Sequence, residues 1–135
     1  MHGRDITPLV RDPETKDWNS PMLLTQTGQS YGAETDTIPT DGRLTAASNV
    51  PWYALLCDGR YKYVRTLVEG EVEELYDLDA DPEELRNLAV RTEHLALVET
   101  LRAKTVAELR RTDAGFANSM PPTKAMQRLR TSPDK

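Results

Sequence analysis

Alternating apolar and polar residues mark the middle of the chain as a small antiparallel sheet. The run WYALLCD from residue 52 is followed by the turn dipeptide Asp58-Gly59 and by RYKYVRTLV, and the turn EGE then leads to VEELYDL. Short runs rich in aromatic and β-branched residues, separated by turn residues, are typical of a β-meander. The pattern predicts three strands within residues 52–78. An earlier run, PMLLTQT at residues 21–27, predicts a further strand.

A helical period replaces this alternation after residue 88. Within residues 92–113 a stripe of side chains recurs at spacings of three or four, at Leu95, Val98, Leu101 or Arg102, Thr105 and Leu109. Thr92 is expected to cap the start of this helix, and Gly115 to end it in the left-handed conformation. The chain is therefore predicted to be an α+β domain, a small antiparallel sheet packed against one C-terminal helix, with long loops and a tail.

The hairpin around Asp58-Gly59 allows both faces of the sheet to be assigned. In a two-residue turn Cys57 pairs with Arg60, and cross-strand partners share a face. One face then carries Trp52, Ala54, Leu56, Tyr61, Tyr63 and Leu67, with Arg65. The other carries Tyr53, Leu55, Cys57, Val64 and Val68, with Lys62 and Thr66. Both faces are substantially apolar, but the single predicted helix can cover only one of them. We therefore expect the second face to pack against another surface.

The remaining segments are polar and proline-punctuated. Residues 1–20 are predicted to be an extended linker, residues 21–115 the folded unit, and residues 116–135 a tail. Residues 28–49 show no sustained period and are predicted to be a long loop, of the kind that is often functional. A length of 135 residues is that of one domain.

The composition of the chain argues against several classes of partner and site. A net charge of −5 leaves no basic excess to neutralise phosphates, so no nucleic-acid partner is expected. The single cysteine, Cys57, excludes an internal disulfide and a thiolate zinc cluster. The two histidines, His2 and His94, lie far apart in the sequence, so a metal site or catalytic triad built on histidine is not expected. No apolar run reaches the roughly 20 residues that a bilayer span needs, and no export signal is visible.

A run of carboxylates at residues 69–84 invites a calcium interpretation. Asp77, Asp79 and Asp81 have the spacing of the first ligands of an EF-hand loop. The pattern then fails, because Pro82 stands where a glycine is needed and Leu88 where a bidentate glutamate is needed. A hydrophilic turn is also a poor place for a carboxyl whose catalytic role requires a raised pKa.

We therefore interpret the run as the connection between a strand and a helix. Asp81 is expected to cap a helical turn that Pro82 begins. Leu85 and Leu88 are expected to anchor the connection under the sheet.

The stretch GRYKYVRTLVEGEVEELYDLDADPEELRNLA, residues 59–89, closely resembles the region near the C-terminus of type I sulfatases, in the alkaline-phosphatase-like superfamily. The opening HGRDITPLV, residues 2–10, looks like the segment that closes the large catalytic domain of that family. Together they span most of the chain, to about residue 113. The resemblance implies a small C-terminal subdomain, a four-stranded antiparallel sheet with a packed helix docked on a larger α/β domain, with residues 21–27 as the fourth strand.

The family's chemistry is hydrolysis of a sulfate ester or sulfamate by a formylglycine made in a C/S-x-P-x-R motif, beside a calcium ion. These parts lie upstream in the family. Here Cys57 is followed two places later by Gly59, and Ser119 is followed by Pro121 but then by Thr123 where the arginine should stand. We therefore expect no catalytic residue and no metal ligand in this chain, and expect calcium and formylglycine only in a catalytic domain upstream.

The resulting expectation is the C-terminal subdomain of a sulfatase, inactive alone, that braces the catalytic domain and lines the substrate entrance. Gln29, Tyr31 and Trp52 are the candidates for that entrance. One alternative is a free-standing protein-interaction or homodimerisation module that uses the second sheet face. Another is the same subdomain from a phosphatase or phosphonate hydrolase of the superfamily. The resemblance further suggests a periplasmic or secreted parent enzyme.

Overall fold

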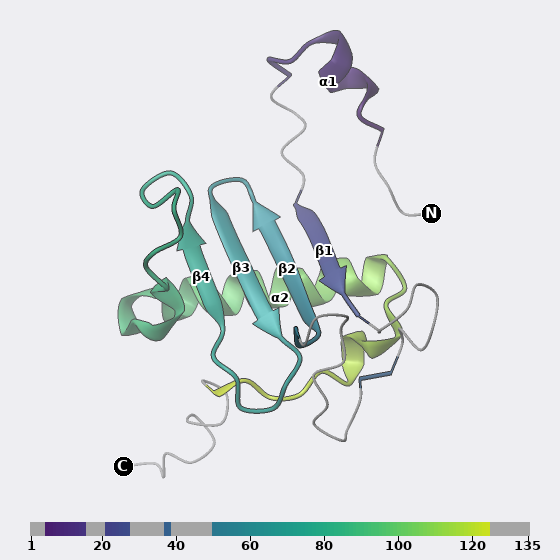
Figure 1. Ribbon diagram of the computed structural model, residues 1–135. Helices are drawn as coiled ribbons and strands as arrows, with labels where there is room; N and C mark the ends of the chain where they lie inside the picture. Colours follow the sequence, from purple (N-terminus) through teal and green to yellow (C-terminus); the bar gives the residue numbers. More distant parts are fainter. Residues whose placement is uncertain (1–4, 16–20, 28–36, 39–49, 125–135) are drawn as a thin grey trace.

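The structure, a computed structural model, describes residues 5–15, 21–27, 37–38 and 50–124 (Figure 1). Four strands form one antiparallel sheet in the order β1-β2-β3-β4, and their bounds are Met22–Gln26, Tyr53–Asp58, Tyr61–Thr66 and Glu74–Asp77. Helix α2, Leu95–Arg111, runs behind one face of this sheet. The predicted α+β fold is confirmed, including the meander and the strand at residues 21–27.

Helix α2 buries the stripe that the sequence period predicts. Its buried side chains are Val98, Leu101, Thr105 and Leu109. Leu95 is the exception, because it lies at the exposed start of the helix and is 40% exposed. The 3-10 turns Leu88–Val90 (η2) and Thr92–His94 (η3) lead into α2 from β4.

The ends of α2 differ from the prediction. Thr92 is not a cap but the first residue of η3, and no side chain caps η3 or α2 at their starts. The left-handed residue after the helix is Asp113, with φ 56°, and not Gly115. The backbone N–H of Ala114 then donates to the carbonyl of Leu109 at 2.9 Å, so the left-handed stop lies two residues before Gly115.

The β2–β3 hairpin turns one residue later than predicted. Asp58 pairs with Tyr61 and Cys57 with Lys62, so Gly59 and Arg60 form the connection. Gly59 has φ +60° while Arg60 does not have a positive φ, as in a type II′ turn with glycine first. Every predicted pair is therefore shifted by two residues. Because side chains alternate with a period of two, the predicted division into faces survives this error.

The core lies between α2 and one face of the sheet. One buried cluster consists of Trp52, Ala54, Leu67, Leu109, Phe116 and Ala117. The other consists of Leu56, Tyr63, Leu75, Ala89, Val98 and Leu101, and Leu23 of β1 packs against both. Phe116 and Ala117 belong to a last 3-10 turn, η4 (Gly115–Asn118), so the packed unit extends beyond the predicted boundary at residue 115.

The N-terminal helix α1, Thr7–Arg11, stands apart from the sheet in Figure 1 and buries none of its residues. The ends of the predicted linker and tail, residues 1–4, 16–20 and 125–135, lie outside the described residues. Among the helices that the structure describes, none has the length and apolar character of a membrane span.

Candidate functional site

The predicted entrance residues fall in different parts of the structure. Gln29 and Tyr31 lie outside the described residues. Trp52 lies in the core with 5% of its surface exposed, and its ring meets the Phe116 ring edge-on at a centroid distance of 6.5 Å. Within the described part of the chain its indole Nε1 is buried without a hydrogen-bond partner. The role of all three residues at a substrate entrance stays a prediction.

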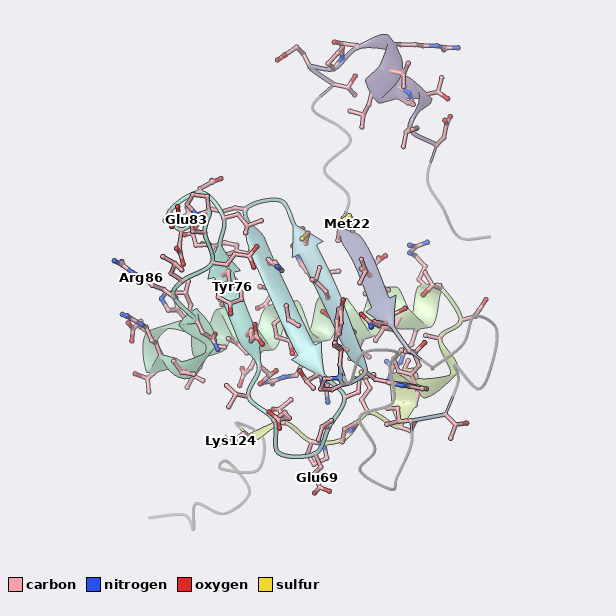
Figure 2. The ribbon with its side chains drawn as sticks, in the orientation of Figure 1. Met22, Glu69, Tyr76, Glu83, Arg86 and Lys124 are labelled. Atoms are coloured by element: carbon pink, nitrogen blue, oxygen red, sulfur yellow. The ribbon has the colours of Figure 1, made fainter. Side chains whose placement is uncertain are left out.

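One face of the sheet is turned away from α2, and we call it the open face (Figure 1). Its residues are Met22, Leu24, Gln26, Tyr53, Leu55, Cys57, Lys62, Val64, Thr66, Glu74 and Tyr76. Figure 1 looks onto this face, with α2 behind the strands, and Figure 2 labels Met22 and Tyr76 at its two sides. No described helix packs on it, so the expectation of an apolar face without a helical cover holds for these residues.

The open face has an apolar side and a polar side. On β1, Met22 is 57% exposed and Leu24 is 43% exposed. On β3 and β4, the Lys62 ammonium pairs with Glu84 and lies 6.0 Å from the centre of the Tyr76 ring. Burial, together with the neighbouring Glu74, raises the pKa of Tyr76 to about 12, so its hydroxyl stays protonated at neutral pH. The face thus offers apolar contact over β1 and β2, with fixed charges at one margin.

Cys57 lies between these two sides. It pairs with Met22 across one strand boundary and with Lys62 across the other. Partial burial raises the pKa of its thiol, although Lys62 acts in the opposite direction. Burial thus favours the protonated thiol over the thiolate, which is the nucleophilic form.

The carboxylates of the acidic run bind the chain's own donors. Asp77 at the end of β4 accepts two hydrogen bonds from the Arg60 guanidinium, the one from Nε at 2.7 Å. It also accepts the backbone N–H groups of Asp79 and Ala80, both at 3.2 Å. The Arg60 hydrogen bond holds the pKa of Asp77 at about 2. This side chain therefore fastens the β2–β3 turn to the end of β4.

Asp81 has a related role, but not the predicted one. Its carboxylate accepts the backbone N–H of Arg86 at 2.8 Å, which closes a loop in which Glu84 has φ 56°. The expected helical turn after Pro82 is absent from this loop, which contains turns only. Leu85 is 75% exposed and so does not anchor the connection, whereas Leu88 does pack against the core. The prediction was wrong for Leu85 because side-chain capping, and not burial, fixes the loop.

Asn87 completes the connection by covering the outer edge of β4. Its Oδ1 accepts the backbone N–H of Leu75 at 3.0 Å and that of Ala89 at 2.9 Å. Its Nδ2 donates to the carbonyl of Glu73 at 3.0 Å. One side chain thus replaces a missing neighbouring strand and starts η2. The sequence pattern alone did not single out this residue for a structural role.

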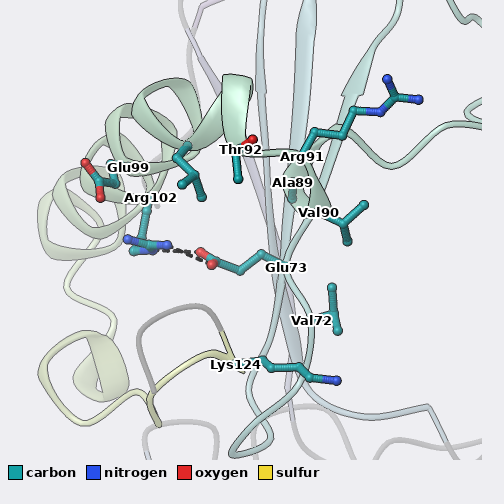
Figure 3. Close-up of a pocket in the computed structure, with 10 residues that line it drawn as sticks. Val72, Glu73, Ala89, Val90, Arg91, Thr92, Glu99, Arg102 and Lys124 are labelled. Atoms are coloured by element: carbon teal, nitrogen blue, oxygen red, sulfur yellow. Dashed lines mark hydrogen bonds and ion pairs between the residues drawn. The ribbon is translucent and has the colours of Figure 1, made fainter. Parts of the chain in front are cut away.

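A buried ionic network ties β4 to α2 and to the C-terminal segment. The Glu73 side chain is 2% exposed and accepts two hydrogen bonds from Arg102 at 2.7 Å, shown dashed in Figure 3. It also accepts the hydroxyls of Tyr63 at 2.5 Å and Thr123 at 3.0 Å. Burial alone would raise the pKa of Glu73, but the donors from Arg102 and Tyr63 outweigh it and lower the pKa. Glu73 is therefore a charged structural centre.

The segment after η4 is held against the sheet by the same region. Arg65 Nη2 donates to the carbonyl of Pro121 at 2.7 Å, and Gly70 N–H donates to the carbonyl of Pro122 at 3.1 Å. The backbone N–H of Lys124 donates to the carbonyl of Glu71 at 3.0 Å. Residues 121–124 of the predicted tail thus belong to the packed unit.

The described residues contain no group of three or more histidine, cysteine, aspartate or glutamate side chains placed to hold a metal ion. The acidic run is therefore not arranged as a calcium cage in this part of the chain. Its oxygens face Arg60 and backbone N–H groups instead.

The likeness of this chain to known proteins is limited to solved structures. No protein-family model and no curated protein matches the chain. Among solved structures, the chain is similar to BT4656, solved in complex with its substrate D-glucosamine-2-N,6-O-disulfate, with 18% identity and a TM-score of 0.48. The match covers 76% of this chain and 20% of that structure, so the chain spans about a fifth of its length.

Proposed function

We propose that this chain is the C-terminal subdomain of a sulfatase, which braces the catalytic domain and carries none of its catalytic groups. The observation that carries the proposal is the stretch at residues 59–89. Its resemblance to the sulfatase pattern extends to the residues that build the β3–β4–η2 joint, since Arg60, Asp77 and Asn87 all bind within it. A four-stranded antiparallel sheet with one packed helix is the subdomain that the resemblance implies.

The open face supports the bracing role. Leu24, Leu55 and Val64 give it an apolar centre that no described helix covers, and a larger domain is the partner that would bury it. The margin with Lys62, Glu84 and Tyr76 would then set the orientation, because partly buried charges favour one docking register. We further propose that Trp52, Gln29 and Tyr31 lie near the substrate entrance of the assembled enzyme.

Hydrolysis belongs to the catalytic domain in this proposal. The purified chain is expected to release no nitrophenol from p-nitrophenyl sulfate, with or without calcium. Turnover by the purified chain would overturn the proposal. The reading frame upstream of Met1 supplies the second test, because it is expected to encode a catalytic domain with the C/S-x-P-x-R motif. An upstream frame unrelated to sulfatases would favour the interaction-module alternative.

Docking can be tested with that upstream catalytic domain produced as a separate chain. The two chains are expected to co-purify and to recover sulfatase activity when mixed. Leu24→Lys, which places a charge on the exposed apolar side of the open face, is expected to weaken co-purification. Leu85→Lys, a change at an exposed leucine outside the open face, is the matched control and should leave it unchanged.

A phosphatase or phosphonate hydrolase of the same superfamily is distinguished by the same reconstituted enzyme. Hydrolysis of p-nitrophenyl phosphate or phenylphosphonate, with no hydrolysis of the sulfate, would replace the sulfatase assignment while leaving the docking role intact.

A further inference from the structure

A cavity of about 390 Å³ opens between the residues that lead into β4, the turns η2 and η3, the first turns of α2 and Lys124 (Figure 3). This volume is within the range of small-molecule sites, roughly 300 to 1,000 Å³. The cavity lies at the β4 edge of the sheet and away from the open face. It is therefore not part of the proposed docking surface.

The wall of the cavity is mainly apolar. Val72, Ala89, Val90 and Leu95 contribute to it. Three of them are unusually exposed for apolar residues, Val72 at 37%, Leu95 at 40% and Val90 at 66%. In Figure 3, Val72 and Val90 stand side by side along one wall. An apolar ligand body seated there would remove these surfaces from water, which is the main source of affinity in such sites.

The charges around the cavity leave an excess of cations. Glu73 and Arg102 neutralise each other on its inner side. Of the other lining residues Arg91 and Lys124 are cationic and Glu99 is acidic, which leaves one net positive charge in a chain of net charge −5. Arg91 has only a loose partner, Glu93 at 3.7 Å, and among the described residues no carboxylate pairs with Lys124.

The placement of these charges favours one end of the cavity for an anion. Figure 3 shows Glu99 on α2 beside Arg102 and Lys124 at another end of the cavity, past Val72, whereas the Arg91 guanidinium points away from the other lining side chains. An anionic head group beside Lys124 would lie away from Glu99 (Figure 3). The apolar body would then rest against Val72 and Val90.

We propose that this cavity binds a small organic carboxylate with an apolar body, such as an aromatic carboxylate. The apolar wall holds the body, Lys124 holds the carboxylate, and Glu99 disfavours a second negative charge. This site goes beyond the proposed subdomain function and does not depend on it, because every group named belongs to this chain.

The experiment uses three probes that share one ring and differ in charge: 2-naphthoate, 2-naphthamide and 2-naphthylmethylammonium. Binding to the full chain is measured by NMR titration, with the amide signals of Val72, Val90 and Leu95 as local reporters. Naphthoate is expected to bind at least about fivefold more tightly than naphthamide, the increment of one charge-assisted hydrogen bond, and the ammonium most weakly. Equal affinity of the three probes would overturn the proposal.

Variants locate the site. Lys124→Gln is expected to weaken naphthoate binding about fivefold while leaving naphthamide binding unchanged. Arg91→Gln is expected to have a smaller effect, because the Arg91 guanidinium points away from the other lining side chains (Figure 3). Glu99→Gln is expected to strengthen naphthoate binding, a direction that a general loss of structure would not produce. Lys104→Gln is the matched control, because its ammonium pairs with Asp58 away from the cavity. If Leu24→Lys on the open face abolishes binding while the cavity variants do not, the proposed site is wrong.

Discussion

At the scale of single residues, the acidic run is a set of structural acceptors. Asp77 holds Arg60, Asp81 holds the N–H of Arg86, and Glu73 holds Arg102. The sequence pattern argued against an EF-hand loop, because Pro82 and Leu88 stand where the pattern needs a glycine and a glutamate. It could not predict which donor each carboxylate binds, since those donors come from β3, from the loop and from α2. Only the folded chain brings them together.

The Glu73 network sets the first prediction. Arg102→Met removes the cation and leaves the Glu73 carboxylate buried beside the hydroxyl donors of Tyr63 and Thr123. Breaking one partner of a buried ion pair is expected to lower the free energy of unfolding by about 3 kcal/mol, measured by urea denaturation. Lys104→Met on the same helix removes an exposed ion pair and should cost less than about 1 kcal/mol. Equal losses in the two variants would contradict a special role for Glu73.

Acid stability gives a second prediction at this scale. The pKa of Asp77 is about 2 in the folded chain, below its ordinary value of 3.8, because Arg60 donates to it. The unfolded chain therefore binds the proton more readily, so the stabilisation is present above pH 3.8 and is lost as the pH falls toward 2. In urea titrations, Asp77→Asn is expected to flatten the decline of stability between pH 4 and pH 2. Asp79→Asn, at a side chain that is 75% exposed, should leave the decline unchanged.

At the scale of elements, short-range patterns predicted the strands and the helix, but long-range contacts decided their details. The buried stripe of α2 follows from its spacing, since Val98, Leu101 and Leu109 face the sheet. The β2–β3 register was predicted wrongly because Asp58-Gly59 and Gly59-Arg60 both suit a two-residue turn. Pairing of Asp58 with Tyr61, and the Arg60 contact with Asp77, accompany the observed turn. The contact between Arg60 and Asp77 could not be predicted from the hairpin sequence, because Asp77 lies outside the hairpin.

The hydrogen bonds between Asn87 and the edge of β4 give a prediction about the stability of that strand. Asn87→Ala removes the acceptor for the Leu75 N–H and the donor to the Glu73 carbonyl. Loss of these hydrogen bonds is expected to lower the free energy of unfolding by about 2 kcal/mol and to speed hydrogen exchange at the Leu75 amide. Arg86→Ala is the neighbouring control, because the bond of Arg86 to Asp81 uses its backbone N–H and survives the change. Unchanged exchange at Leu75 in Asn87→Ala would show that the edge does not depend on this side chain.

At the scale of the whole molecule, the two faces of the sheet have different surroundings. One face, with Trp52, Leu56 and Tyr63, is buried under α2 and the segment after it. The other is the open face, whose apolar character follows from the alternation along β2 and β3 and could be predicted from the sequence. The partner of the open face could not be predicted from the sequence. An apolar pattern shows which side chains are available for contact, but it does not identify the surface that covers them. The burial of Trp52 was equally invisible, since Phe116, its ring partner, lies beyond the predicted end of the folded unit.

The open face makes a final prediction about the isolated chain. Without a larger domain, the exposed Met22 and Leu24 are expected to drive weak self-association, because contiguous apolar surface favours contact with another copy. Sedimentation velocity should show a weight-average mass that rises with protein concentration. Leu24→Lys is expected to reduce this rise and Leu85→Lys, at an exposed leucine off the face, to leave it unchanged. The catalytic domain, when added, should replace self-association with a one-to-one complex. A chain that stays monomeric at every concentration would show that the open face does not drive self-association. Equal effects of Leu24→Lys and Leu85→Lys would show that the contact lies outside the open face.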